Sequence, residues 1–355
     1  MKKYMVAMSG GVDSAVSARL IKEKYGNATG VTLKMFDKTD RRFYKNGCDS
    51  PDADLIDAKN TADILGIEHL TYDYSEIFEK YVIDGFIESY LSGDTPNPCV
   101  LCNKHIKFGA LIDAAKELGF DKIATGHYAI IEQNDTGRYL LKKAKDPKKD
   151  QTYFLYSLTQ EQLKMSEFPL GNLTKEEARD VAYALELPVR EKKDSQDICF
   201  IPDGDFYGFI CDFKKIVPHV GNYLDKEGNI LGLHEGAVKY TVGQRKGLGI
   251  ALGQPMYVLE KNMAQNTVTL GLNSDLFSSE LTAREVNFIP FDKLLSPMRV
   301  MAKVRYRHEA SPATVEMIED GQIRVTFDTP QRAITSGQSV VLYDGNIVIG
   351  GGIIN

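Results

Sequence analysis

The first 130 residues alternate between short apolar runs and longer stretches with helical spacing, and no other feature limits the fold as strongly. Tyr4 to Met8 is typical of a buried parallel strand. Residues 14–25 then place apolar side chains at helical intervals. The same alternation predicts further strands at 28–33, 68–74 and 122–125, and further helices at 52–66, 76–90 and 104–118. This rhythm indicates an α/β fold with a doubly wound parallel sheet, whose ligands gather at the carboxyl ends of the strands.

The remainder of the chain differs in character. Residues 128–143 have the pattern of a hairpin, and Thr174 with Glu177 forms a capping box that opens a helix ending at Pro188. From about Gly221 onward, short alternating segments with frequent glycine dominate. Six such strands are expected at 281–288, 298–306, 313–318, 323–327, 339–343 and 347–354, which suits a small antiparallel β-barrel. We therefore expect a catalytic sheet domain over 1–205, a small, mostly β central domain over 206–275 and a C-terminal barrel over 276–355.

The composition excludes several classes of protein. The 355 residues are 43% hydrophobic and carry a net charge of −6, and no apolar run approaches the ~18 residues of a membrane span. The N-terminus lacks the pattern of a signal peptide, and five cysteines are too few for a disulfide framework. A cytoplasmic protein without a membrane partner is expected. One basic segment, residues 142–150, holds five lysines.

The loop after the first strand has the chemistry of a phosphate site. Ser9, Gly10 and Gly11 allow a tight turn whose backbone N–H groups face an anion at a helix N-terminus. No GK[ST] follows, so the loop is not a Walker A motif, and the spacing is not GxGxxG either. Nucleotide binding without a γ-phosphate clamp is indicated.

The stretch SGGVDS (residues 9–14) resembles the PP-loop of the ATP pyrophosphatases, which cleave ATP between the α- and β-phosphates. This resemblance implies that the loop grips the pyrophosphate and that Asp13 helps to place Mg²⁺. Leu33 replaces a Met common in that family, and Gly126 matches a glycine that lets the backbone approach the adenosine. The implied ATP-binding residues are Ala7, Met8, Ser9, Gly10, Gly11, Val12, Asp13, Ser14, Leu33 and Gly126.

A CxxC pair lies in TPNPCVLCNKHIKFG, residues 95–109. On its own, the pair of Cys99 and Cys102 is compatible with half a zinc site, a redox dithiol, an iron–sulfur ligand set or a nucleophile. A third cysteine, Cys199, stands in DSQDICFI, residues 194–201. Cys48 and Cys211 lie outside these motifs and are expected to be structural thiols.

Together with KKDQTYFL (148–155), GQRKGLGI (243–250) and the all-β C-terminus, these motifs resemble the tRNA-specific 2-thiouridylases over essentially the full length. The resemblance implies ATP-dependent adenylation of O2 of the wobble uridine, followed by sulfur transfer. It implies that Cys199 carries a persulfide and that Cys102 is its partner, ending as a Cys102–Cys199 disulfide. Cys99 stands where many members have Asp, so a 4Fe–4S cluster on Cys99, Cys102 and Cys199 remains the alternative route. Zinc completed by His105 or His127 is a weaker alternative.

The same resemblance implies how tRNA is held. The target base must leave the stack to reach the cleft. Arg245 and Lys246 offer a further grip on the RNA backbone. The implied contacts are Asn97, Pro98, Cys99, His127, Lys149, Asp150, Gln151, Arg305, Tyr306 and Gln338.

The expected partners are the anticodon arm of tRNA, with the Lys, Glu and Gln isoacceptors as in the family, and a sulfur donor. That donor would be a cysteine desulfurase or a sulfur-relay carrier. The competing interpretations are another PP-loop ligase or amidotransferase, and an RNA-binding module stabilised by a metal.

Overall fold

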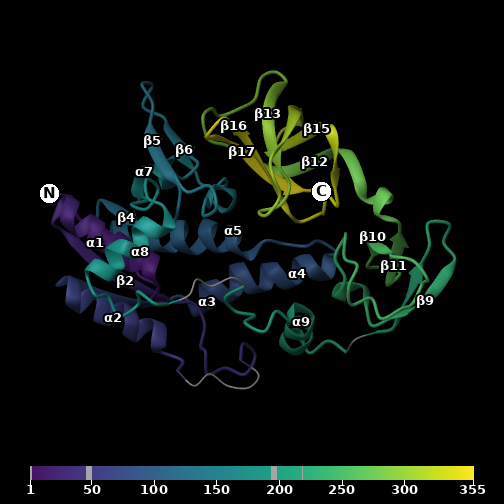
Figure 1. The fold of residues 1–355 in the computed structure, drawn as a ribbon, viewed down its shortest axis with the longest axis horizontal. Helices are drawn as coiled ribbons and strands as arrows, with labels where there is room; N and C mark the ends of the chain where they lie inside the picture. The colour runs from purple at the N-terminus through teal and green to yellow at the C-terminus, as the bar shows by residue number, and fades with distance from the viewer. Residues whose placement is uncertain (1, 45–49, 193–197, 218) are drawn as a thin grey trace.

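The computed structural model describes residues 2–44, 50–192, 198–217 and 219–355. Its first domain, in which Figure 1 labels β2 and β4, is built on a parallel sheet in the order β3-β2-β1-β4-β7. Every pairing in this sheet is parallel, which confirms the predicted sheet type. The strands are β1 (Tyr4–Ala7), β2 (Ala28–Lys34), β3 (Glu68–Asp73), β4 (Lys122–Ala124) and β7 (Ser166–Glu167).

Helices cover both faces of this sheet. Alternate residues of β1 enter different clusters: Met5 packs in one, and Tyr4 and Val6 pack in the other. One face is covered by α1 (Val12–Tyr25), α2 (Ala53–Leu65) and α8 (Lys175–Ala184). The other face is covered by the continuous helical segment α5 (Pro98–Cys102), η2 (Asn103–Ala110) and α6 (Leu111–Glu117), with α7 (Gln160–Met165) beside it. The doubly wound α/β prediction is confirmed.

A third apolar cluster lies beyond the carboxyl ends of the strands. Phe78, Phe86 and Phe200 are fully buried in it, and the partly exposed thiol-bearing segment around Cys199 runs past it. Its helices are α3 (Ser75–Phe78), η1 (Glu79–Ile83), α4 (Asp84–Ser92) and α9 (Phe206–Lys214). The predicted helix at 76–90 is thus three consecutive pieces, because a π-helical turn, η1, interrupts it.

The six predicted C-terminal strands form a closed antiparallel barrel. Its sheet runs β12-β15-β14-β13-β16-β17, and a β12–β17 pairing closes it. The strands are β12 (Phe277–Phe288), β13 (Met298–Lys303), β14 (Ser311–Glu319), β15 (Gln322–Arg332), β16 (Ser339–Asp344) and β17 (Ile347–Ile354).

The predicted hairpin is present as β5 (Ile130–Gln133) and β6 (Tyr139–Lys142), but it extends the sheet of the barrel. Ile347 of β17 pairs with Lys142 of β6. Tyr153 and Tyr156 of the first domain share one buried cluster with Val341 and Tyr343 of the barrel. The barrel is therefore docked onto the catalytic domain through a common core.

The central module holds a four-stranded sheet in the order β10-β11-β8-β9. Its strands are β8 (Gly221–Leu224), β9 (Ile230–His234), β10 (Tyr257–Asn262) and β11 (Thr267–Gly271), which confirms a small, mostly β unit. Within the described part of the chain, no helix is both long enough and apolar enough to cross a membrane. The prediction for Cys48 and the DSQD portion of the Cys199 motif lie outside the described residues.

Candidate active site

The SGGVDS loop turns sharply between β1 and α1. Gly10 adopts φ +69°, a left-handed conformation that side chains disfavour, and Gly11 stands at the helix N-cap. The Ser14 hydroxyl donates to Gly11 O at 2.9 Å and accepts from Ser9 N at 3.1 Å. These bonds hold the turn ahead of the α1 N-terminus, where unpaired N–H groups favour an anion.

Two glycines let other backbones approach this loop closely. A Cβ at Gly10 would lie 2.2 Å from the Asp54 carbonyl oxygen, and a Cβ at Gly126 would lie 2.9 Å from Ser14 N. Gly126, at the end of β4, therefore packs directly against the loop that begins at the end of β1. The strand ends meet where the parallel-sheet argument places a ligand.

Two lysines that the sequence analysis did not single out brace the loop. Lys175 Nζ lies 2.7 and 2.8 Å from the two oxygens of Asp13, and the Tyr128 hydroxyl donates to Asp13 Oδ1 at 2.8 Å. Lys192 Nζ donates to Gly10 O at 2.9 Å and to Asp54 Oδ1 at 2.7 Å. These partners are far apart in sequence, so no local motif indicated them.

The other predicted ATP residues line the same strand ends. Ala7 ends β1, and Met8 N donates to Val31 O at 2.7 Å, which continues the β1–β2 pairing into the loop. Met8 and Val12 are buried on the α1 side of the sheet. Leu33, near the end of β2, packs against both the sheet core and the cluster that contains Cys102.

The CxxC pair begins a helix. Asn97 caps α5 by accepting from Cys99 N at 3.2 Å, and Pro98 occupies the first turn, where its missing N–H costs nothing. Cys99 is exposed and Cys102 is buried. Cys199 reaches the same region on the exposed segment after residue 197, and all three are free thiols.

The surroundings of the three thiols favour their protonated forms. Burial raises the pKa of Cys99 and Cys102, while the Lys107 ammonium opposes that rise. Burial together with the neighbouring Cys102 and Cys99 thiols raises the pKa of Cys199 to about 12. The Cys99 and Cys199 side chains are exposed, so a reagent can reach them. Because their pKa values are raised, only a small fraction of each is thiolate at neutral pH.

Among the residues that the structure describes, no group of three or more His, Cys, Asp or Glu side chains is placed to hold a metal ion. His105 stacks on Tyr81 at 4.7 Å between ring centroids. His127 is buried between Phe108 and Phe168, and this burial lowers its pKa well below the ordinary value. Neither imidazole is arranged as a ligand beside the cysteines.

The helix after Cys102 is π-helical over η2, which the sequence analysis also missed. The side chain of Gln162, from α7, donates to Phe108 O at 2.7 Å and to Lys104 O at 3.4 Å. A Cβ at Gly109 would lie 3.0 Å from Lys104 O, so glycine suits this wide turn. Such turns are common at functional sites. The only local signal was glycine inside a helical pattern.

Of the residues expected to contact tRNA, Asp150 and Gln151 are held in place by hydrogen bonds to neighbouring segments. Gln151 N donates to Tyr128 O at 2.9 Å, and the Gln151 side-chain oxygen accepts from Tyr128 N at 2.9 Å. Asp150 accepts from Ala144 N at 3.0 Å and from the Thr152 hydroxyl at 2.6 Å, and burial raises its pKa. Tyr306 packs on Phe154 close by, at 4.4 Å between centroids.

Two further expected contacts are engaged inside the protein. Arg305 donates to Ala333 O at 2.9 Å and to Val242 O of the central module at 3.2 Å. Gln338 Nε2 donates to Thr95 O at 2.7 Å, two residues before the Asn97 cap. Gln338 therefore contacts the segment that leads into the Asn97 cap, whereas Arg305 lies at the junction of the barrel with the central module.

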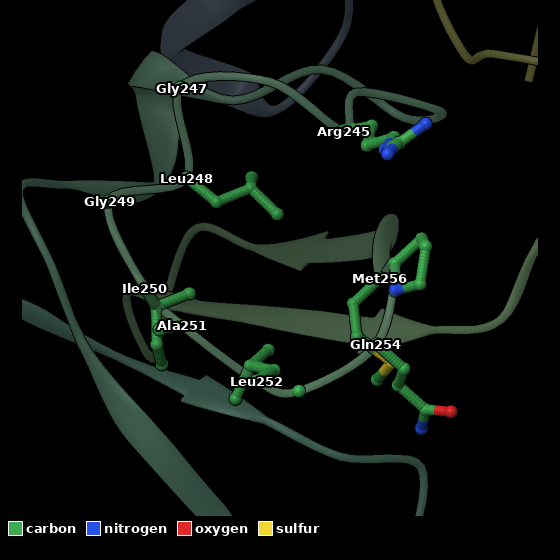
Figure 2. A pocket seen from close by; sticks show the side chains of 11 residues that line it. Arg245, Gly247, Leu248, Gly249, Ile250, Ala251, Leu252, Gln254 and Met256 are labelled. Atoms are coloured by element: carbon green, nitrogen blue, oxygen red, sulfur yellow. The ribbon is translucent and has the colours of Figure 1, made fainter.

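Arg245 and residues 247–250 of the GQRKGLGI segment line a cavity of about 650 Å³ in the central module, together with residues 251–256. Arg245 and Gln254 lie on one side of this cavity, and Leu248, Ile250 and Leu252 lie on the other (Figure 2). Arg245 and Lys246 are exposed, as a grip on RNA requires. Cys211 is half-buried on α9, away from this cavity.

Three family models match the chain. A tRNA methyl transferase HUP domain covers residues 2–203, a tRNA methyl transferase PRC-barrel domain covers 209–272 and an aminomethyltransferase beta-barrel domain covers 278–354. Among solved structures, an NMN synthetase from Francisella tularensis is 19% identical, with a TM-score of 0.33, and the match covers 60% of this chain and 77% of that one.

Curated relatives match at much higher identity. A tRNA-specific 2-thiouridylase MnmA from Clostridioides difficile is 49% identical over 99% of this chain and 98% of its own length. Another from Acetivibrio thermocellus is 51% identical over 99% of both. The descriptions of the family models mention methyl transfer, whereas the names of the relatives mention thiolation. We assign the family from the relatives, because their similarity to this chain spans both proteins almost completely. The chain belongs to the tRNA-specific 2-thiouridylase family.

Proposed function

We propose that this chain is a tRNA-uridine 2-sulfurtransferase that uses ATP to replace O2 of a wobble uridine with sulfur. The observation that carries the proposal is the combination of a near-complete match to 2-thiouridylases with a nucleotide loop and a set of free thiols at one end of the sheet. A family match alone would leave the chemistry unassigned. Each half of the reaction has side chains to perform it.

The first half is adenylation. The uracil O2 attacks the α-phosphate of ATP, which gives an adenylated base and pyrophosphate. The turn at Ser9, Gly10 and Gly11 and the α1 N-terminus are suited to the departing pyrophosphate. Both oxygens of Asp13 are held by Lys175, so this carboxylate does not form a Mg²⁺ site by itself, and Mg²⁺ would enter with the phosphates of ATP.

The second half is sulfur transfer. The outer sulfur of a persulfide on Cys199 attacks C2, and AMP leaves with the former O2. Cys102 then loses its thiol proton to water and attacks the inner sulfur of Cys199, which breaks the S–S bond, so that the outer sulfur stays on the base. A Cys102–Cys199 disulfide results, and an external dithiol must supply two electrons to reopen it. A persulfide-carrying donor, such as a cysteine desulfurase or a relay carrier, reloads Cys199.

The alternative sulfur carrier is a 4Fe–4S cluster on Cys99, Cys102 and Cys199. The chemistry of three thiols and an open position would suit it. The described side chains do not converge as a ligand set. The residues as arranged do not fit the cluster, and no step is assigned to it.

The tRNA is proposed to span the domains. Asn97, Pro98 and Cys99 would lie against the flipped base, since they open the helix that carries Cys102. Lys149 and Tyr306 occupy one corner of the first domain and the barrel, and both belong to the proposed RNA surface. We also propose the division 1–205, 206–275 and 276–355, the Lys, Glu and Gln isoacceptors as substrates, and a cytoplasmic location where tRNA is available.

The decisive experiment compares single serine variants of the thiols. Cys102→Ser and Cys199→Ser should each reduce 2-thiouridine formation by at least about a thousandfold while tRNA-dependent pyrophosphate release persists. Cys211→Ser, a half-buried thiol on α9, serves as the matched control and should retain activity. An active Cys199→Ser enzyme would favour a ligase or amidotransferase, and tRNA binding without pyrophosphate release would favour an RNA-binding module.

The sulfur carrier is tested separately. Iron and acid-labile sulfide are measured in anaerobically reconstituted wild type and in Cys99→Ala. Thiolation from a persulfide donor in iron-free protein supports the Cys102–Cys199 route. A stoichiometric cluster that Cys99→Ala abolishes, together with activity that depends on it, would replace that route.

A further inference from the structure

Residues 93–96, which lead into the cysteine helix, are held by the C-terminal barrel. Asp94 accepts from Arg284 Nη2 of β12 at 2.9 Å and from the Ser336 hydroxyl. Thr95 N donates to Ser336 O at 2.8 Å, and Thr95 O accepts from Gln338 Nε2 at 2.7 Å. The Asp94 side chain and the Thr95 backbone are therefore both held by the barrel loop that contains Ser336 and Gln338.

Gly337 makes this contact as close as it is. Its φ is +84°, and a Cβ at this position would lie 2.7 Å from both Asp94 Cβ and Thr95 N. The barrel loop and the 93–96 segment thus touch backbone to backbone, with no room for a methyl group. The central module reaches the same segment, because a Cβ at Gly93 would lie 3.0 Å from Met263 Cγ.

The contact is not what docks the barrel. Docking is already secured by the shared core of Tyr153 and Tyr156 with Val341 and Tyr343, and by the β17–β6 pairing. The bonds to residues 94–96 are additional, and they end one residue before the Asn97 cap. Two residues further on comes Cys99, and Cys102 lies in the same helix.

We propose that the barrel loop 335–338, together with Arg284, is a clamp on Asp94 and Thr95 that positions the Asn97–Cys102 helix for sulfur transfer. Asp94 and Gly337 are its positioning residues, and neither touches the reacting atoms. This proposal rests on the proposed function. Under this proposal the barrel does more than hold tRNA. Its rigid contact with Asp94 and Thr95 also fixes the position of the α5 thiols relative to the tRNA that the barrel binds.

The test is Gly337→Ala with Gly321→Ala as its matched control. Gly321 lies in the β14–β15 turn at φ +74°, with nothing within 4 Å of a new Cβ. Both variants carry the same left-handed strain, but only Gly337→Ala forces the clamp apart. A displacement of about 1 Å at a catalytic group costs on the order of 100-fold in rate. We expect Gly337→Ala to lower the single-turnover rate of persulfide-loaded enzyme by about 10- to 100-fold relative to the control.

Two further readouts separate positioning from general damage. The alkylation rates of Cys99 and Cys102, mapped on peptides without substrates, should change in Gly337→Ala and not in Gly321→Ala. The tRNA dissociation constant should stay within error of the control. Asp94→Asn keeps the shape but loses the ion pair, so it should show a smaller defect of the same kind even if Gly337→Ala folds poorly.

Three outcomes overturn the proposal: equal single-turnover rates in Gly337→Ala and Gly321→Ala, an unchanged rate in a folded Asp94→Asn, or a loss confined to tRNA affinity. Failure of the proposed function is distinguishable, since the wild type in the same assay would then form no 2-thiouridine at all.

Discussion

Two glycines at opposite ends of α1 allow the geometry of the nucleotide loop to be tested against an internal standard. Gly10 precedes the helix at φ +69°, and Gly26 ends it at φ +73°. A Cβ at Gly26 would meet nothing within 4 Å, whereas one at Gly10 would lie 2.2 Å from the Asp54 carbonyl oxygen. Replacement by alanine therefore imposes the same backbone strain at both sites and a steric clash at only one.

The magnitudes follow from this difference. A left-handed conformation costs a non-glycine residue about 1–2 kcal/mol, so Gly26→Ala should lower the free energy of unfolding by about that amount. Overpacking against a backbone atom adds about 1–3 kcal/mol for Gly10→Ala. If the loop relieves the clash by moving, its N–H groups leave their positions around the phosphates. A loss of about 1.4 kcal/mol in binding already raises the ATP dissociation constant tenfold.

The assay measures ATP-analogue binding by calorimetry and unfolding by denaturant for both variants and the wild type. Gly10→Ala should bind at least about tenfold more weakly, and Gly26→Ala should bind as the wild type does. Equal ATP affinity for the two variants would refute the assignment of residues 9–14 as the phosphate loop. Equal stability would refute the close approach of Asp54.

Three other predictions follow from the ionisable groups and the π-helical turn. Burial alone would raise the pKa of Asp54, but hydrogen bonds from Lys192 and Lys38 leave it lowered, so its contribution to stability is present above the ordinary pKa of about 4 and is lost as pH falls. The melting-temperature gap between wild type and Lys192→Met should therefore stay constant from pH 7 to about pH 4 and shrink as pH falls below about 4, and a gap that persists unchanged well below pH 4 would contradict this. Cys199 in the resting enzyme should react with iodoacetamide slowly at pH 8 and faster as pH rises toward its pKa of about 12; rapid alkylation at pH 7 would contradict a burial-raised pKa. Gln162→Ala removes the donor to Phe108 O and should speed amide exchange in 104–110, which hydrogen-exchange mass spectrometry measures.

The fold was largely predictable, because local sequence patterns indicate most of its helices and strands. Strand and helix periodicities located the parallel sheet and the six barrel strands, and the capping box at Thr174 and Glu177 is present as predicted. The place of the β5–β6 hairpin was not predictable, because its pairing with β17 depends on residues about 200 positions away, such as Lys142 and Ile347. Local periodicity carries no information about such partners.

The site was predictable where chemistry needs a particular backbone. The SGGVDS motif and the CxxC pair can be recognised in the sequence, since a tight anion-binding turn needs glycine and sulfur chemistry needs thiols. The lysines that hydrogen-bond to the loop could not be predicted, because Lys175 lies 162 residues from Asp13 in the sequence and Lys192 lies 182 residues from Gly10. The roles expected for His127 and Gln338 stay predictions, and both side chains are engaged within the protein.

Adenylation and sulfur transfer require the α-phosphate and a thiol to meet at one base, and Leu33 shows how the fold brings them near. Leu33 stands at the carboxyl end of β2, beside the strand that feeds the nucleotide loop. Its side chain packs against the sheet core on one side and against the cluster holding Cys102 on the other. The cluster that contains Cys102 and the strand beside the nucleotide loop are therefore in contact through Leu33. In the proposed function, a base held against Asn97 and Cys99 would face the nucleotide and the thiols without moving between separate sites. The proposed activated intermediate requires this, because water would otherwise hydrolyse it.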